Sequence, residues 1–215
     1  CDFLCSLLQI GPKPFRRGKT VLKCGPNGAE RGSGMTQQEL LSLAEEVGFS
    51  HAGELNRAAL EFLPQVREMC AADRCHNYGR CWTCPPACGT LEEAARRAGR
   101  YRRGVLLQST GTLEDDFDVE TMQETERLQR ERFAVFVERV RRADPDCLPM
   151  GTGGCGICAA CTCPDAPCRF PDRAIPSMEA YGLWVSRVCE RSGLPYYYGP
   201  GTITYTACVL VDAAQ

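Results

Sequence analysis

Five cysteines lie close together in the stretch 153–171, which reads GGCGICAACTCPDAPCRFP. Three of them, Cys155, Cys158 and Cys161, have CxxCxxC spacing. This spacing lets three thiolates converge on one point, and the glycines and other small residues let the backbone wrap closely around it. The stretch is therefore predicted to bind a metal ion or a metal cluster.

An iron–sulfur cluster is favoured over zinc here, because CxxCxxC followed by a more distant cysteine near a proline is typical of cluster-binding loops. Zinc sites more often use two separated CxxC pairs. Cys163 follows Cys161 too closely for both to reach one metal without strain, whereas Cys168 lies on a loop with room to return. We therefore expect Cys163 to be a packed thiol. The expected ligands of a [4Fe–4S] cluster are Cys155, Cys158, Cys161 and Cys168, and a zinc site that only folds the loop is the alternative.

A second cysteine-rich stretch, 70–89, reads CAADRCHNYGRCWTCPPACG and also has the character of a metal site. A proline directly after a cysteine, as in residues 84–86, stiffens the exit of a cluster-binding loop. His76 is expected to hydrogen-bond at the surface, and Tyr78 and Trp82 are expected to shield the site from water. Five thiols compete for four places, so the assignment stays open. The expected metal ligands are Cys70, Cys75, Cys81 and Cys84, with Cys88 as the fifth candidate.

The chain has 16 cysteines in 215 residues, and ten of them lie in these two stretches. Disulfide-rich secreted domains are usually short and spread their cysteines throughout, so this clustering favours metal binding in a reducing compartment. We therefore expect a cytoplasmic protein. No run of about 18 apolar residues is present, so no membrane span is expected.

The formal net charge is −2, with acidic and basic residues interspersed, so no nucleic-acid partner is expected. The arginines of residues 96–103 are interpreted as a solvated helix face and not as a phosphate site. Residues 1–34 lack hydrophobic periodicity and are expected to be a leader or linker outside the fold, together with Cys1, Cys5 and Cys24. The folded domain is then expected over residues 35–215.

The remaining sequence must supply the elements that position the two stretches. Apolar residues at helical spacing predict helices over residues 35–47, 90–98, 119–143 and 176–192. A further helix is predicted over residues 56–63, where Pro64 kinks it or separates it from a following turn that ends at Cys70. Thr36 with Glu39 matches a capping box, and Thr90 is the expected N-cap of its helix. Strands are predicted at residues 49–55 and 104–110, and a hairpin is predicted from residues 196–198 and 202–211. This alternation predicts an α/β or α+β fold, with a mixed sheet, packed helices and two cysteine-rich loops.

The motifs C-x4-C-x2-YG and W-x-CPP-x2-G in residues 70–89, and GC-x2-C-x2-C and PCR-x-P-x4-PSMEA-x-G in residues 154–182, resemble those of the DUF2284 family of bacterial and archaeal proteins. The resemblance extends from about residue 35 to the end of the chain. It implies cysteine-bound metal in a soluble protein of anaerobes and supplies no established reaction. It also implies that Cys70, Cys75 and Cys84 belong to the first family motif, whereas Cys81, Cys88 and Cys163 are additions in this chain.

The expected function is that of an iron–sulfur protein with one or two clusters, which carries electrons to a partner protein or reduces a small-molecule substrate. A zinc-stabilised interaction module and a metal-sensing or metal-delivery protein are the alternatives. No nucleophile elbow, P-loop or Rossmann glycine pattern is present, so no catalytic residue is assigned. Arg169, Glu179 and Tyr181 could form a substrate-handling set beside a cluster. We favour a structural interpretation, in which Arg169 donates to nearby carbonyls, Glu179 complements a helix start and Tyr181 packs.

Overall fold

The computed structural model describes residues 34–213. The expected leader therefore lies outside the described residues except for Gly34, and so do Cys1, Cys5 and Cys24. The described part combines helices with one four-stranded sheet in the order β1-β2-β4-β3, an α+β architecture. In chain order the elements are α1 (Gln37–Val47), β1 (His51–Glu54), the 3₁₀ helix η1 (Arg57–Ala59), α2 (Pro64–Ala71), α3 (Leu91–Ala98), β2 (Tyr101–Thr112), α4 (Val119–Ala143), β3 (Leu148–Met150), the 3₁₀ helix η2 (Glu179–Tyr181), α5 (Val185–Arg191) and β4 (Thr202–Ala213).

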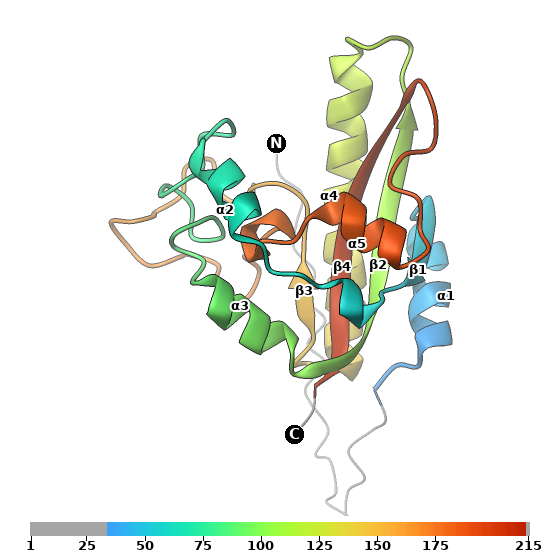
Figure 1. Cartoon of the computed structure of the whole chain (residues 1–215), viewed down its shortest axis with the longest axis horizontal. Coiled ribbons are helices and arrows are strands. Elements are labelled where there is room, and N and C mark those ends of the chain that lie inside the picture. The colour runs from blue at the N-terminus through green and yellow to red at the C-terminus, as the bar shows by residue number, and fades with distance from the viewer. Residues whose placement is uncertain (1–33, 214–215) are drawn as a thin grey trace, which may run out of the picture. The chain divides into compact units, whose positions relative to one another are not determined.

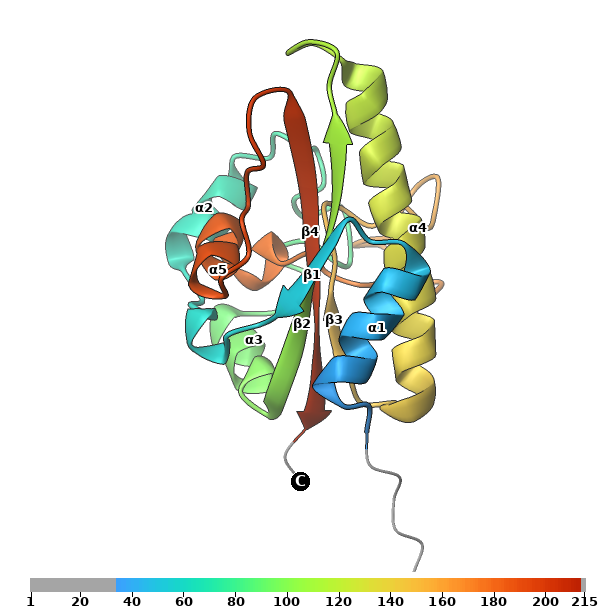
Figure 2. The same ribbon diagram turned by 90° about the vertical axis from the view of Figure 1, so that its right-hand side faces the viewer.

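Strands β2 and β4 form the centre of the sheet, and all three strand pairings are antiparallel. Because successive side chains of a strand point to opposite faces, Val105 and Leu107 pack on one side and Leu106 packs on the other. Helices α1 and α4 cover the first face, and α3, α5 and η2 cover the second (Figures 1 and 2). The sheet is thus buried on both faces, which explains the continuous apolar run in β2.

Several helix boundaries follow directly from local sequence. Thr36 and Glu39 form the expected capping box at the start of α1, and Gly48 ends the helix in a left-handed conformation with φ 94°. Thr90 and Glu93 form a second capping box at the start of α3. Helix α4 matches its predicted bounds, and its Phe136 side chain is fully buried, in edge-to-face contact with Phe49 at 5.9 Å between ring centroids.

The predicted helix at residues 56–63 is wrong. Asn56 caps a helix by accepting a hydrogen bond from the Ala58 amide at 3.0 Å, but that helix is the single turn η1. Phe62 instead forms a β-bridge with Leu183. Helix α2 then begins at Pro64, because the first turn of a helix tolerates a residue without an N–H, and it carries Cys70 near its end.

The single helix predicted over residues 176–192 is also wrong, although its end is close to the observed end of α5 at Arg191. Gly182 adopts φ 84°, which ends η2, and α5 begins only at Val185. A Cβ atom on Gly182 would lie 2.4 Å from the Leu91 side chain of α3, so a larger residue would force that side chain to move and would also be strained by the positive φ.

The strand predicted at residues 202–211 is confirmed as β4, but the hairpin with residues 196–198 is wrong. Strand β4 pairs instead with β2 and with β3, which was not expected from the sequence. Tyr198 instead stacks on His51, with ring centroids 4.0 Å apart, and donates a hydrogen bond to the Gln108 side chain at 2.7 Å. Tyr198 therefore packs against side chains of β1 and β2 and does not extend the sheet.

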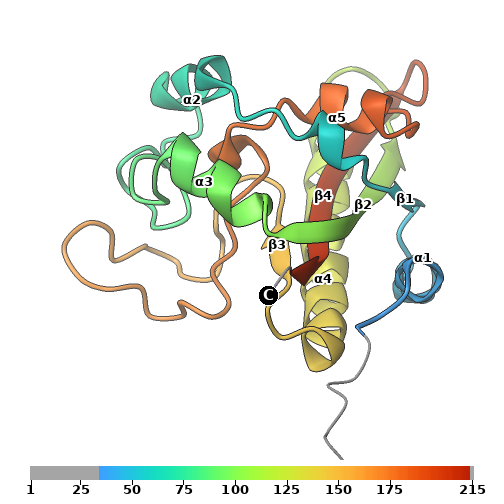
Figure 3. The same ribbon diagram turned by 60° about the horizontal axis from the view of Figure 1, so that its bottom comes forward.

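The two cysteine-rich stretches leave the sheet on the same side. In Figures 1 and 3 the chain between α2 and α3 and the long loop after β3 lie side by side, away from α1 and β1. Within residues 34–213, no helix is long and apolar enough to cross a membrane.

Candidate metal centre

The two cysteine-rich stretches dock on each other through side-chain contacts with backbone carbonyls. The Trp82 indole N–H donates to the Ala166 carbonyl at 3.0 Å. The Cys163 thiol is buried and donates to the Gly79 carbonyl at 3.7 Å. These contacts join segments more than 80 residues apart in sequence, so the stretches form one structural unit.

A cavity of about 250 Å³ lies between the docked stretches. It is lined by side chains from both, including Asn77 and Trp82 from the first and Ile157 and Phe170 from the second. The cysteines that line it are Cys81, Cys155, Cys158, Cys161 and Cys168. The structure thus brings the four cysteines predicted from the second stretch to one cavity and adds Cys81 from the first.

Two glycines let the second stretch approach its neighbours closely. A Cβ atom on Gly154 would lie 2.7 Å from the amide nitrogen of Asn77, and one on Gly156 would lie 2.7 Å from a guanidinium nitrogen of Arg130. Real Cβ contacts are almost never that short. The Asn77 amide itself donates to the Cys75 carbonyl at 3.0 Å, so the first stretch is held in place at this point.

The other cysteines of the first stretch form a neighbourhood beside η2, which Cys81 adjoins. Cys70 lies close enough to Cys75 and Cys88 for their charges to interact, and Cys84 interacts with Cys81, to which it is hydrogen-bonded, and with Cys75. The Cys88 thiol donates to the Ala180 carbonyl at 3.6 Å. Cys81 therefore lines the cysteine cavity and also interacts with Cys84 and Cys88, and the predicted ligand set Cys70, Cys75, Cys81 and Cys84 stays a prediction.

The family model described as a predicted metal-binding protein, DUF2284, matches residues 54–211, which is more than half of the chain. The chain belongs to the DUF2284 family. No curated protein and no solved structure matches it.

Four thiols of this DUF2284 protein have a raised pKa in the two neighbourhoods. Desolvation raises the pKa of Cys70, Cys88 and Cys155, and it raises the pKa of Cys84 to about 12. These thiols are therefore protonated at neutral pH unless a metal displaces the proton.

The pKa of Cys81 shifts in the opposite direction. Burial alone would raise the pKa of its thiol, but hydrogen bonds from the hydroxyl and amide of Thr83 and from the Cys155 amide outweigh burial and lower the pKa. The Cys81 sulfur lies 3.3 Å from the Thr83 hydroxyl, and the side chain is only 2 % exposed. Cys81 is therefore prepared to become a thiolate, a feature that the spacing of cysteines alone could not reveal.

The donor set fits a metal bound by thiolates, although it is not in a ligating arrangement. Within residues 34–213, no group of three or more His, Cys, Asp or Glu side chains is arranged so that it could hold a metal ion. The cavity nevertheless offers soft sulfur donors from two loops, and glycines leave room for close approach at its rim. Formation of a metal centre thus requires these thiols to lose their protons and to turn toward a common point.

The three polar residues singled out after the second stretch have different roles. Arg169 donates to the Ala160 carbonyl at 2.9 Å, as the structural interpretation predicts. One carboxylate oxygen of Glu179 is buried without a hydrogen-bond partner in the described part of the chain, and desolvation raises the pKa of this group. Tyr181 is packed, with 5 % of its surface exposed.

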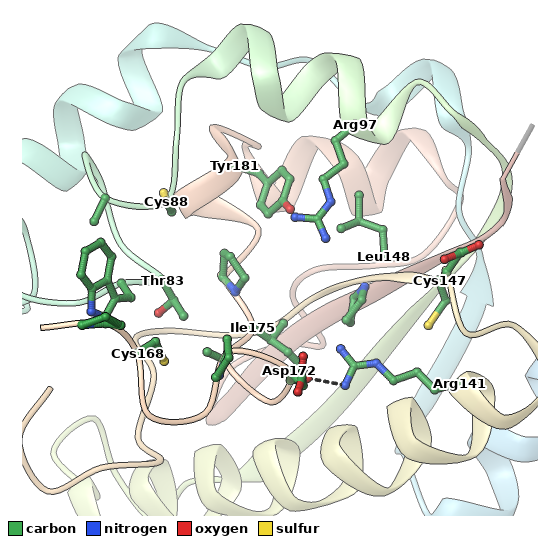
Figure 4. Close-up of a pocket in the computed structure, with 18 of the residues that line it drawn as sticks. Thr83, Cys88, Arg97, Arg141, Cys147, Leu148, Cys168, Asp172, Ile175 and Tyr181 are labelled. Atoms are coloured by element: carbon green, nitrogen blue, oxygen red, sulfur yellow. Dashed lines mark hydrogen bonds between the residues drawn. The ribbon is translucent and has the colours of Figure 1, made fainter. Parts of the chain in front are cut away.

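A larger cavity of about 1120 Å³ adjoins the cysteine cavity. Figure 4 shows Arg97 of α3, Tyr181 of η2 and Arg141 of α4 around it. The residues that line both cavities are Trp82, Thr83, Cys168 and Ala174. This second space was not foreseen, because α3, η2 and the segment before β3 meet only in the folded chain.

Proposed function

We propose that this protein holds a [4Fe–4S] cluster in the cysteine cavity and acts in electron transfer. One observation carries the proposal: the two cysteine-rich stretches, remote in sequence, line a single cavity with five thiols. Sulfur-only donor sets suit iron–sulfur clusters and zinc, and CxxCxxC spacing favours the cluster. The family description supports metal binding without naming the metal.

Three ligands are Cys155, Cys158 and Cys168, and the fourth comes from one of two competing thiols. The spacing of the second stretch favours Cys161, which is exposed. Proximity favours Cys81, because the thiols close enough to interact electrostatically with Cys155 are those of Cys81, Cys158 and Cys168. The lowered pKa of Cys81 adds to its candidacy, since thiolates are the metal-binding form.

A second centre belongs to the neighbourhood beside η2, formed by Cys70, Cys75, Cys84 and Cys88. These thiols lie close enough to one another for electrostatic interaction, and Cys81 interacts with Cys84 and Cys88. Arg67 stands beside Cys70 and Cys88 and opposes the rise of their pKa. A cation in that position offsets the negative charge of several thiolates.

An iron–sulfur cluster supplies one-electron exchange when it is bound. The side chains of this protein would hold it, limit its contact with water and expose one side to a redox partner. Trp82 and Ile157 line the cavity as the apolar shield, while Cys161 is exposed and marks the side open to solvent. The partner is an electron-donor or electron-acceptor protein or a small reducible substrate.

Single cysteine replacements test the proposal, with iron and sulfide content and the visible spectrum as measurements. Cys158→Ala is expected to remove the chromophore of the cavity. Cys163→Ala is the matched control from the same loop, because Cys163 is a packed thiol bonded to a carbonyl, and this variant keeps its iron. Of Cys81→Ala and Cys161→Ala, the variant that loses iron identifies the fourth ligand. A full complement of iron in Cys158→Ala, or in both of the other two variants, would contradict the proposal.

A further inference from the structure

The larger cavity has a wall with two hydrogen-bond donors that no protein group uses. Tyr181 is 95 % buried, yet within residues 34–213 its hydroxyl has no hydrogen-bond partner. The hydroxyl is also not among the fully enclosed polar atoms that lack partners, so it opens toward the cavity that Tyr181 lines. The hydroxyl of a largely buried side chain is thus available to a ligand in the cavity.

Arg97 stands beside this hydroxyl. Figure 4 shows the guanidinium group of Arg97 and the Tyr181 hydroxyl directed toward each other at the same wall. Among the described residues, no hydrogen bond or ion pair engages the Arg97 side chain, whereas Arg141 across the cavity donates to the Asp172 carbonyl at 2.6 Å. The Arg97 guanidinium group and the Tyr181 hydroxyl can therefore donate hydrogen bonds to a ligand in the cavity.

The charges around the cavity limit what that ligand can be. Three arginines and three aspartates line it, so the cavity as a whole has no strong positive field. The positive charge of Arg97 is local and suits a single negative charge better than a multiply charged phosphate. The arginines are Arg97, Arg100 and Arg141, and the aspartates are Asp146, Asp165 and Asp172.

The rest of the wall is suited to a hydrocarbon body. Leu148 and Ile175 face the cavity in Figure 4, and Pro149 and Pro176 line it as well. Ligand sites typically combine such apolar walls with a few polar groups that fix orientation. The volume of about 1120 Å³ leaves ample room for a small organic molecule.

We propose that this cavity binds the carboxylate of a small organic acid, with Arg97 and Tyr181 as the donors to its two oxygens. An arginine fork and a hydroxyl match a carboxylate in geometry, and hydrogen bonds to charged groups are the stronger ones. Burial raises the pKa of Tyr181, with Arg97 opposing, so the phenol keeps its proton and donates at neutral pH. The same cavity is also lined by Trp82, Thr83 and Cys168, which it shares with the cysteine cavity.

Isothermal titration calorimetry of the purified protein with benzoate tests this site. Benzoate is expected to bind with a Kd of about 1 mM or tighter, which is within reach of a ligand of this size. Benzamide has the same shape without the charge and is expected to bind at least about tenfold more weakly. Inorganic phosphate is expected to bind more weakly than benzoate.

Variants identify the donors. Arg97→Gln is expected to weaken benzoate binding by at least about tenfold, and Tyr181→Phe by a few fold. Arg142→Gln is the matched control, because Arg142 is an exposed arginine paired with Glu138 on α4, and this variant binds benzoate like the unaltered protein. Thermal melts check that each variant is folded.

Three results would overturn the proposal: no saturable benzoate binding, equal binding of benzoate and benzamide, or unchanged benzoate affinity in Arg97→Gln. Tighter binding of phosphate would reject the carboxylate assignment. The site does not depend on a metal, and the titration is independent of the iron analysis. Failure of the carboxylate site and failure of the iron–sulfur proposal are therefore distinguishable.

Discussion

Replacement of Gly154 by alanine is expected to separate the two cysteine-rich stretches. The added Cβ atom would lie 2.7 Å from the Asn77 amide nitrogen, whereas ordinary contacts begin at 3.4 Å, so Asn77 must move by about 0.7 Å (3.4 − 2.7). That shift strains the hydrogen bond from Asn77 to the Cys75 carbonyl. Insertion of a methyl group into a packed site costs about 1–3 kcal/mol. If this cost falls on the metal-bound state, metal affinity decreases by about 5- to 150-fold.

A chelator competition, followed by absorption and by metal content after dialysis, measures this effect. Gly156→Ala is the matched control, because its added Cβ would meet only the end of the flexible Arg130 side chain, which can move away. In a double-mutant cycle, Asn77→Ala removes the obstacle, so Gly154→Ala is expected to cost little in that background. Equal metal retention by Gly154→Ala and the unaltered protein, or equal losses in both backgrounds, would refute the argument that contact at Gly154 holds the stretches together.

Three further predictions concern stability and pH. Phe136→Ala removes a fully buried ring that packs on Phe49 and is expected to lower the free energy of unfolding by about 3–5 kcal/mol in urea titrations; a loss below about 1 kcal/mol would contradict the packing. Burial raises the pKa of Cys189 and Cys147 from 9.0 to about 11, so the folded state holds these protons more tightly than the unfolded state. This stabilisation is present below pH 9 and is lost between pH 9 and 11, by on the order of 2–3 kcal/mol per thiol; urea midpoints that stay constant across this range would contradict it. Ligand thiols such as Cys84, with a pKa of about 12, must release protons to bind metal, so acidification from about pH 8 to about pH 6 is expected to release metal, and retention in dialysis at the lower pH would argue against thiolate ligation.

The elements that could be predicted from sequence are those decided by local interactions. Helix α4 was predicted with its observed bounds because a long apolar stripe and the residues at both ends agree. The capping box at Thr36 and the N-cap at Thr90 likewise depend only on residues three positions apart. Strand β2 was predicted from its apolar run, although it extends beyond the predicted range 104–110 by three residues at its start and two at its end.

The errors arose where tertiary contacts decide the outcome. Gly182 ends η2 because the chain must pass α3, and Phe62 pairs with Leu183 because the two segments meet in space. Strand β3 is three residues long and is defined by its pairing with β4, so no local sequence pattern predicts it.

The candidate site, too, could be predicted from the sequence only in part. The spacing of the second stretch was enough to predict that its cysteines share one place, and four of them line one cavity. The position of Cys81 could not be predicted, because its neighbours Cys155 and Cys168 are more than 70 residues away in sequence. Arg97 was interpreted as part of a solvated helix face, since only the folded chain places it beside Tyr181.

The most direct test of the central claim is anaerobic purification followed by iron, sulfide and zinc analysis together with the visible spectrum. A cluster in the cysteine cavity predicts about four irons and four sulfides per chain, and a second centre beside η2 raises both to about eight. A broad thiolate-to-iron absorption band should accompany them and should bleach on addition of dithionite. A colourless protein with stoichiometric zinc and no sulfide would contradict the account, because the cysteine-rich stretches would then bind a metal that cannot exchange electrons.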